Sequence, residues 1–182
     1  MQTEMLTHTL TGQTHDILSQ VQKIKLLHND LLTWRANKDS WNILECLEHL
    51  NRYGNYYLPA IEQKILSSSS QHDPIFKSGL LGGYFAKSML PKKKLNKMKT
   101  FSDKNPLHAP LEVTVIDRFM AQQIQLLDLL DKSKHVSWNK VKIETSISRF
   151  IKLKLGDTFQ FYINHMLRHM QQIENIQVKY LS

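Results

Sequence analysis

The sequence has a single cysteine, Cys46, and lacks any long apolar run. One cysteine cannot form an internal disulfide, so a disulfide-stapled fold is excluded and a reducing compartment is expected. The first 16 residues carry neither a cationic stretch nor an apolar core, so no signal peptide is predicted. No run approaches the roughly 20 apolar residues that a transmembrane helix needs. We therefore expect a cytoplasmic protein with no membrane partner.

Glycine and proline are scarce, and more than half of them lie in one stretch. The chain has six glycines and five prolines, and residues 71–109 hold three of each. About forty residues without a long element are too many for a simple connector. We expect this stretch to be an ordered excursion over one end of the fold, with a short helix between Leu80 and Leu90.

Composition is that of a soluble globular protein, and the length of 182 residues favours one domain spanning the whole chain. The formal charge of +8 is unevenly distributed along the chain, because residues 87–104 contain seven lysines and one acid. Nucleic-acid binders usually place Arg and Lys along a helix or face with aromatic residues between them. Here the lysines, including the run at 92–94, lie in a loop. We expect a solvated loop and no nucleic-acid partner.

Hydrophobic periodicity predicts four long helices. In each of them apolar residues recur at steps of three and four, which places them on one face. The expected helices span about residues 5–33, 41–66, 111–131 and 156–177. Joined by one long connection, they indicate an all-α four-helix bundle.

Local signals refine these segments. Ser40 is predicted to cap the second helix, and Pro110 is predicted at the first position of the third. Gly54, in the middle of a helix, indicates close approach of a neighbour. The alternation around Val141 and Ile143 predicts a short extended piece.

Two histidines stand out in the last helix. His165 and His169 lie four residues apart, so their side chains share one face and can reach a single metal ion. That face is broadly apolar, which indicates a helix inside a bundle. The best third ligand is His49, at the margin of the apolar stripe of the second helix. Three imidazoles with an open position are typical of a catalytic divalent site. From the residues alone, hydrogen-bonded core histidines remain the alternative.

Residues near these histidines in the sequence also have expected roles. Glu45 and Gln172 are placed to orient a ligand imidazole, although a solvated Glu45 is the preferred interpretation. Cys46 is expected to be a small buried residue, with metal or thiol binding as the alternative. Tyr53, like Tyr162 and Phe161, is expected to pack in the core first and to line a pocket second.

Three motifs, at residues 41–53, 97–101 and 161–173, together resemble the DinB-like superfamily, which includes bacillithiol and mycothiol transferases. Residues 41–53 (WNILECLEHLNRY) resemble the family pattern in which Trp-Ser opens the second helix and leads to His-Leu or His-Leu-Asn. Residues 161–173 (FYINHMLRHMQQI) are similar to the closing pattern H-x2-R-H-x2-Q-I. Residues 97–101 (KMKTF) are similar to a basic loop of many members. Asn42 replaces the usual Ser, and a common proline is missing before Ser40; neither departure touches a ligand.

The resemblance implies an up-down-down-up four-helix bundle that forms a homodimer. It also implies a divalent metal held by His49, His165 and His169, with Zn or Ni ahead of Fe or Mn. The expected function is a metal-dependent transfer to or from a low-molecular-weight thiol, or a related hydrolysis, acting on a small-molecule substrate. A non-catalytic bundle that binds a metal or small molecule is the alternative.

Overall fold

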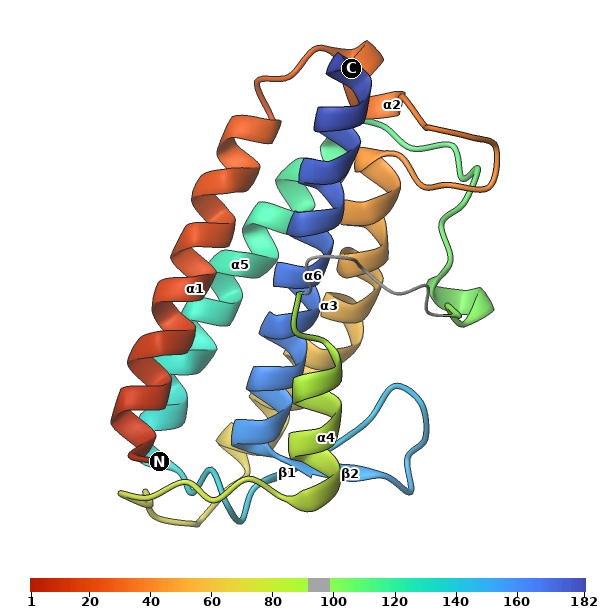
Figure 1. Cartoon of the computed structure of the whole chain (residues 1–182). Helices are drawn as coiled ribbons and strands as arrows, with labels where there is room; N and C mark the ends of the chain where they lie inside the picture. Colours follow the sequence, from red (N-terminus) through yellow and green to blue (C-terminus); the bar gives the residue numbers. More distant parts are fainter. Residues whose placement is uncertain (92–98) are drawn as a thin grey trace.

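A computed structural model describes residues 1–91 and 99–182, and this part of the chain is mostly helical with one small two-stranded sheet (Figure 1). The α-helices are α1 (Thr3–Ile24), α2 (Asn29–Thr33), α3 (Ile43–Leu66), α4 (Leu80–Ser88), α5 (Thr114–Lys132) and α6 (Leu155–Leu181). The strands are β1 (Lys142–Glu144) and β2 (Lys152–Lys154), and short 3-10 turns span Ser102–Lys104 (η1) and Ser133–His135 (η2).

The four long helices α1, α3, α5 and α6 lie side by side (Figure 1). Both α3 and α1 pack against α5 and α6, so the four apolar stripes meet in one core. Ile17, Leu47, Phe119 and Ile163, one from each helix, are completely buried there. The helical class predicted from periodicity is confirmed.

The prediction of one helix up to Thr33 was wrong. Helix α1 ends at Ile24, and α2 begins at Asn29 after His28, whose Nδ1 accepts a hydrogen bond from the Asp30 amide at 3.5 Å. Leu31 and Leu32 in α2 are still buried, so the apolar spacing continues across the break. Periodicity could not reveal the interruption because both segments bury the same face.

The prediction of Ser40 as the cap of α3 was also wrong, since the cap is Asn42. The Asn42 Oδ1 accepts from the Glu45 amide, and the Glu45 carboxylate accepts from the Asn42 amide, both at 2.8 Å. Ser40 instead closes a turn by donating to the Asn37 carbonyl. This reciprocal capping box fixes the start of α3, and asparagine is as effective a cap as serine.

Pro110 is not the first residue of a helix, because α5 begins only at Thr114. The chain before it turns at His108, which has a φ of 61°, and the His108 amide donates to Glu45 Oε1 at 2.6 Å. Because this turn is anchored to Glu45, α5 begins after Pro110 and not at it. The predicted extended piece is confirmed as β1, where Ile143 pairs with Leu153 of antiparallel β2.

The excursion contains the predicted short helix, α4, which packs along α6 (Figure 1). Asp157, fully buried in the first turn of α6, accepts hydrogen bonds from Ser78 Oγ at 2.5 Å and from the Gly79 amide at 2.9 Å. The carboxylate therefore holds the start of α4 against α6. None of the helices in the described part of the chain combines the length and apolar character that crossing a bilayer requires.

Gly54 marks a close approach between helices, as predicted. A Cβ atom there would lie 2.0 Å from Gln122 Oε1 and 2.8 Å from the Tyr162 hydroxyl oxygen. Gln122 cannot easily give way, because its buried amide donates to the Asn51 carbonyl at 3.2 Å and to Asn55 Oδ1 at 2.8 Å.

Gly54→Ala should therefore lower the free energy of unfolding by about 1–3 kcal/mol, although alanine favours a helix. The matched change is Gly12→Ala in α1, where no described atom apart from the local helix backbone and chain neighbours lies within 4 Å of the new Cβ; it should raise the free energy of unfolding by about 0.5–1 kcal/mol. Urea unfolding of both variants measures the difference. Two changes of the same sign and size would contradict the close approach.

Candidate metal centre

Helices α3 and α6 bring three histidines together. The Nε2 atom of His165 lies 3.2 Å from Nε2 of His49 and 3.0 Å from Nε2 of His169. The three side chains are 3–7% exposed, and one ligand atom from each lies within 4.8 Å of the others. This group could hold a metal ion.

The outer ring nitrogens of two histidines are held by oxygen acceptors. His49 Nδ1 lies 2.7 Å from the Lys104 carbonyl, and His169 Nδ1 lies 2.9 Å from Gln172 Oε1. A carbonyl oxygen only accepts, so each Nδ1 carries the proton and each Nε2 presents its lone pair. Gln172 thus orients a histidine, as sequence reasoning suggested. The Lys104 carbonyl was missed.

His165 lies between these two lone pairs. Neutral His165 has only one N–H for these two neighbours, and its Nδ1 is buried with no hydrogen-bond partner among the described residues. A cation in their midst would instead satisfy all three lone pairs. In tetrahedral zinc sites with Zn–N of about 2.0–2.1 Å, ligand nitrogens are about 3.3–3.4 Å apart. The separations here are close to that, so the three residues fit a divalent ion.

Burial keeps these imidazoles neutral. It lowers the pKa of His49 to about 4, and the charges of Arg52 and Lys104 act in the same direction, against the hydrogen bond to the Lys104 carbonyl. Burial also holds the pKa values of His165 and His169 well below the ordinary value, and neighbouring histidines add to this effect. Neutral imidazole is the form that binds metals.

Aromatic rings enclose the histidines. The Trp41 ring lies 4.7 Å from that of His49 and 5.8 Å from that of His169, measured between centroids. The Tyr53 ring lies 5.0 Å from that of His49 and 4.7 Å from that of His165. Burial raises the pKa of Tyr53 to about 12, so its hydroxyl keeps its proton. Tyr53 is buried as expected and also lines the histidine cluster.

Glu45 is not solvated, contrary to the preferred interpretation of the sequence. It is 1% exposed, and besides capping α3 it forms an ion pair with Arg35 at 3.1 Å and accepts from the His108 amide. Within the described residues its hydrogen bonds go to these groups and to Asn42, not to a histidine. Its role is to tie two loops to the start of α3.

Cys46 is the small buried residue that was expected. It is completely buried, and that burial raises the pKa of its thiol above the ordinary range, with Glu45 adding to the effect. In the native protein it should therefore react with Ellman's reagent at least about a hundredfold more slowly than in 6 M guanidinium, because attack requires an exposed thiolate. Comparable rates under the two conditions would contradict this placement.

The remaining histidines do not join the cluster. All six are exposed: His8, His15, His28, His72, His108 and His135. The lysines at 92–94 and the first two residues of the basic loop, Lys97 and Met98, lie outside the described residues. Lys99 and Phe101, which follow them, are exposed.

A mostly helical protein with buried histidines converging from two long helices defines a class of candidate metal-binding helical proteins. A family model described as the DinB superfamily matches residues 13–173, a range that includes all three histidines. The chain belongs to the DinB superfamily, and the resemblance seen in its motifs is confirmed. No curated protein and no solved structure matches the chain.

Proposed function

We propose that this protein is a metal-dependent enzyme in which His49, His165 and His169 hold one divalent ion. Zn or Ni is preferred over Fe or Mn: imidazole suits Zn, Ni and Fe better than Mn, and the affinity of a nitrogen site rises from Mn through Fe to Ni. The proposed reaction is transfer involving a low-molecular-weight thiol, or a related hydrolysis, on a small-molecule substrate. One observation carries the proposal: three buried Nε2 atoms converge while two of the outer nitrogens are held by oxygen acceptors.

The chemistry follows from this donor set. When bound, a divalent ion stabilises thiolate or hydroxide near neutral pH and polarises an acceptor. The chain's own groups hold and shield the site: the Lys104 carbonyl and Gln172 orient two imidazoles, and Trp41 and Tyr53 exclude water. Arg52 and Lys104 also lie near His49, but Arg52 pairs with Glu48 at 3.2 Å and Lys104 with Asp103 at 3.0 Å, so both charges are already compensated.

The proposal extends to the assembly. We expect one domain over residues 1–182, an up-down-down-up order of α1, α3, α5 and α6, and a cytoplasmic homodimer. What supports it is membership of the DinB superfamily. Light scattering during gel filtration measures the molar mass, and a mass of one chain would argue against the dimer.

Metal analysis and turnover test the function. Protein purified without an affinity tag is reconstituted with Zn, Ni, Fe or Mn and assayed with thiols plus electrophilic acceptors, and with hydrolysable esters and amides. We expect one ion per chain and metal-dependent turnover in wild type and in the control His15→Ala. His165→Ala should show neither. One ion per chain without turnover would favour the non-catalytic alternative, and no stoichiometric ion in wild type would refute the proposal.

Gln172→Ala should weaken metal binding about ten- to hundredfold, since partners of ligand histidines commonly contribute this much. The neighbouring change Gln171→Ala is the control, because Gln171 donates instead to Glu174 at 2.9 Å. Competition with a chromogenic chelator measures both affinities. Equal affinities would show that the hydrogen bond to His169 is dispensable.

A further inference from the structure

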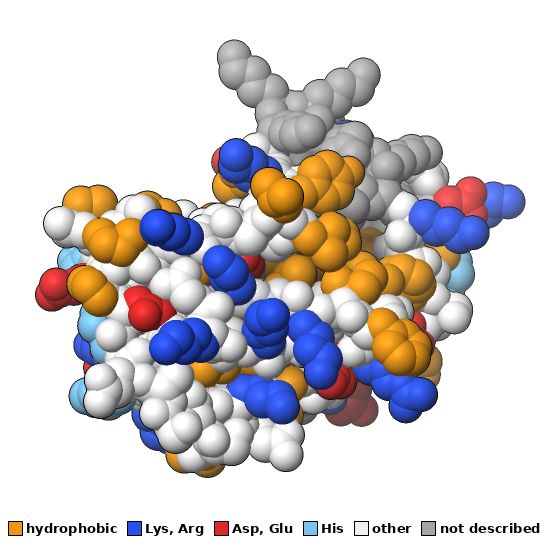
Figure 2. Space-filling model, turned by 90° about the horizontal axis from the view of Figure 1, so that it is seen from below, with side chains coloured by type: hydrophobic (Ala, Val, Ile, Leu, Met, Phe, Trp, Pro, Cys, Tyr) orange, Lys and Arg blue, Asp and Glu red, His pale blue; other side chains and the backbone are white. Residues whose placement is uncertain are grey.

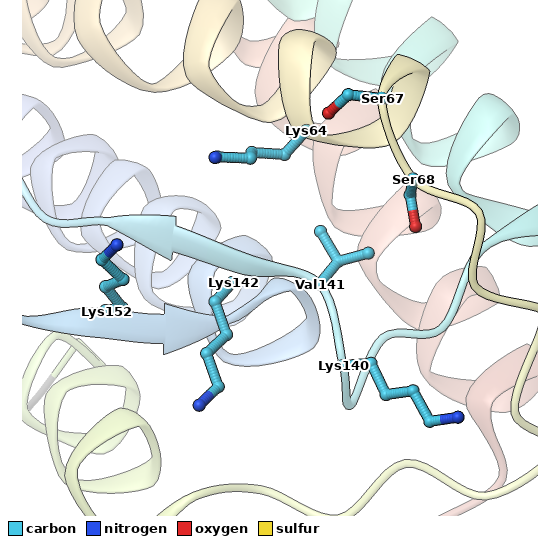
Figure 3. A pocket seen from close by; sticks show the side chains of 7 residues that line it. All are labelled: Lys64, Ser67, Ser68, Lys140, Val141, Lys142 and Lys152. Atoms are coloured by element: carbon cyan, nitrogen blue, oxygen red, sulfur yellow. The ribbon is translucent and has the colours of Figure 1, made fainter.

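A second candidate binding site lies at the opposite end of α3 from His49. Its pocket has a volume of about 360 Å³, within the range of small-molecule sites. Its polar lining comes from the end of α3 and from the hairpin segment: Lys64, Ser67, Ser68, Lys140, Lys142 and Lys152. Figure 3 shows Lys64, Ser67 and Ser68 across from the strands that carry Lys142 and Lys152. Lys64 follows His49 by 15 residues, or about 22 Å of helix, so the two sites are separate.

Among the described residues, the lining carries four lysines and no acid. The Lys152 ammonium pairs with Glu144 at 3.3 Å, but Lys64 and Lys142 form no ion pair within the described part of the chain. Asp73 lies near Lys140 and, held as a carboxylate by Ser137 and Asn139, offsets part of the Lys140 charge. The pocket therefore keeps a net positive charge.

Structural roles account for only part of this charge. Lys64, in the last turn of α3, complements the negative end of the helix dipole. That explanation does not extend to the hairpin, where Lys142 stands directly opposite Lys154 and the adjacent pair, Ile143 and Leu153, is buried. Like charges facing each other across strands destabilise a sheet. Figure 2 shows Lys and Arg side chains gathered on this end of the molecule.

Hydroxyl groups add hydrogen-bond donors beside the ammonium groups. Ser67, the C-cap of α3, has no side-chain hydrogen bond within the described residues, and Ser68 Oγ lies 2.7 Å from Ser70 Oγ. Val141, only 7% exposed, provides an apolar floor. Ammonium and hydroxyl donors around an open pocket match the oxygens of a phosphate group.

We propose that this pocket binds a soluble anion carrying at least two phosphate groups. Such an anion would offset the charges of Lys64 and Lys142, which form no ion pair among the described residues, and would accept a hydrogen bond from the Ser67 hydroxyl. A phospholipid headgroup offers the same phosphate chemistry, so the experiment must separate the two sources.

Calorimetric titration with pyrophosphate at low salt tests the site. The variant Lys64→Gln/Lys142→Gln should bind about tenfold more weakly than wild type, as expected for two exposed charge pairs. The control Lys23→Gln/Lys38→Gln removes the same charge elsewhere and should bind within about twofold of wild type. Each titration is repeated in the His165→Ala background, where retained binding shows that no ion at the histidines is involved.

Three results would overturn the proposal: no binding of pyrophosphate to wild type, equal weakening in both double variants, or loss of binding with His165→Ala. A parallel arm measures sedimentation with vesicles of phosphatidylcholine alone and with added phosphatidylserine. Binding to the anionic vesicles without binding of pyrophosphate would also overturn it, in favour of a lipid surface. Because the metal site is assayed separately, failure here leaves the proposed enzymatic function unaffected.

Discussion

Adding Zn²⁺ or Ni²⁺ to the metal-free protein is expected to raise its free energy of unfolding by about 4 kcal/mol when free metal exceeds Kd a thousandfold. The reason is that the three histidines converge only in the folded chain, through α3 and α6. For a chain of this length the gain corresponds to a rise in Tm of about 8–16 °C. Calorimetric melting with and without metal measures it.

His165 is the residue to change, because its Nε2 lies within 3.2 Å of both other Nε2 atoms. In His165→Gln and His165→Ala the metal-dependent rise should vanish. Each variant is compared with its own metal-free form, so any loss of packing does not enter the result. His15→Ala, an exposed change, should keep the full rise. A rise of wild-type size in both His165 variants would exclude the proposed ligand set.

The histidine pair of α6 could be predicted because its signal is local. An i, i+4 spacing on an apolar arc fixes the relative position of His165 and His169 from the sequence alone. Spacing alone could not identify His49 as the third ligand, since its approach to α6 depends on how two helices pack. Its place at the edge of the α3 stripe, together with the motif at 41–53, was sufficient to identify it.

The Lys104 carbonyl could not be predicted. Every residue has a backbone carbonyl, so the sequence gives no sign of which one will accept from His49, and Lys104 is 55 residues away. Glu45 was misinterpreted for a related reason. Glutamate is rarely buried unless it is paired, and its partners Arg35 and His108 lie in loops whose paths periodicity does not determine.

The lysine pocket was overlooked because charge was counted along the chain. Residues 140–154 carry five basic side chains and one acid, and Lys64 comes from the distant helix α3, whose own charges nearly balance. Only the hairpin, which places β1 and β2 beside the end of α3, brings them together (Figure 3). The cluster is thus a property of the fold rather than of any one segment.

Glu45→Ala is expected to lower the free energy of unfolding by about 3–5 kcal/mol, as is typical when one partner of a buried ion pair is removed. The change would leave the amides of Asn42 and His108 and the guanidinium of Arg35 without their shared acceptor. Glu45→Gln keeps the shape and one carbonyl oxygen, so it should destabilise by about 1–2 kcal/mol. Urea unfolding of the metal-free protein measures both.

The control is Glu62→Ala in the same helix, where the carboxylate is 38% exposed and lies 3.9 Å from Lys132; it should change stability by less than about 0.5 kcal/mol. If Glu45→Ala lowers the free energy of unfolding by no more than this, the buried carboxylate does not hold the two loops against α3. The contact between Glu45 and the His108 amide also affects the metal centre, because His108 and the Lys104 carbonyl belong to the same segment between α4 and α5. Glu45→Gln should therefore also weaken metal binding, through a carbonyl that Glu45 itself does not touch.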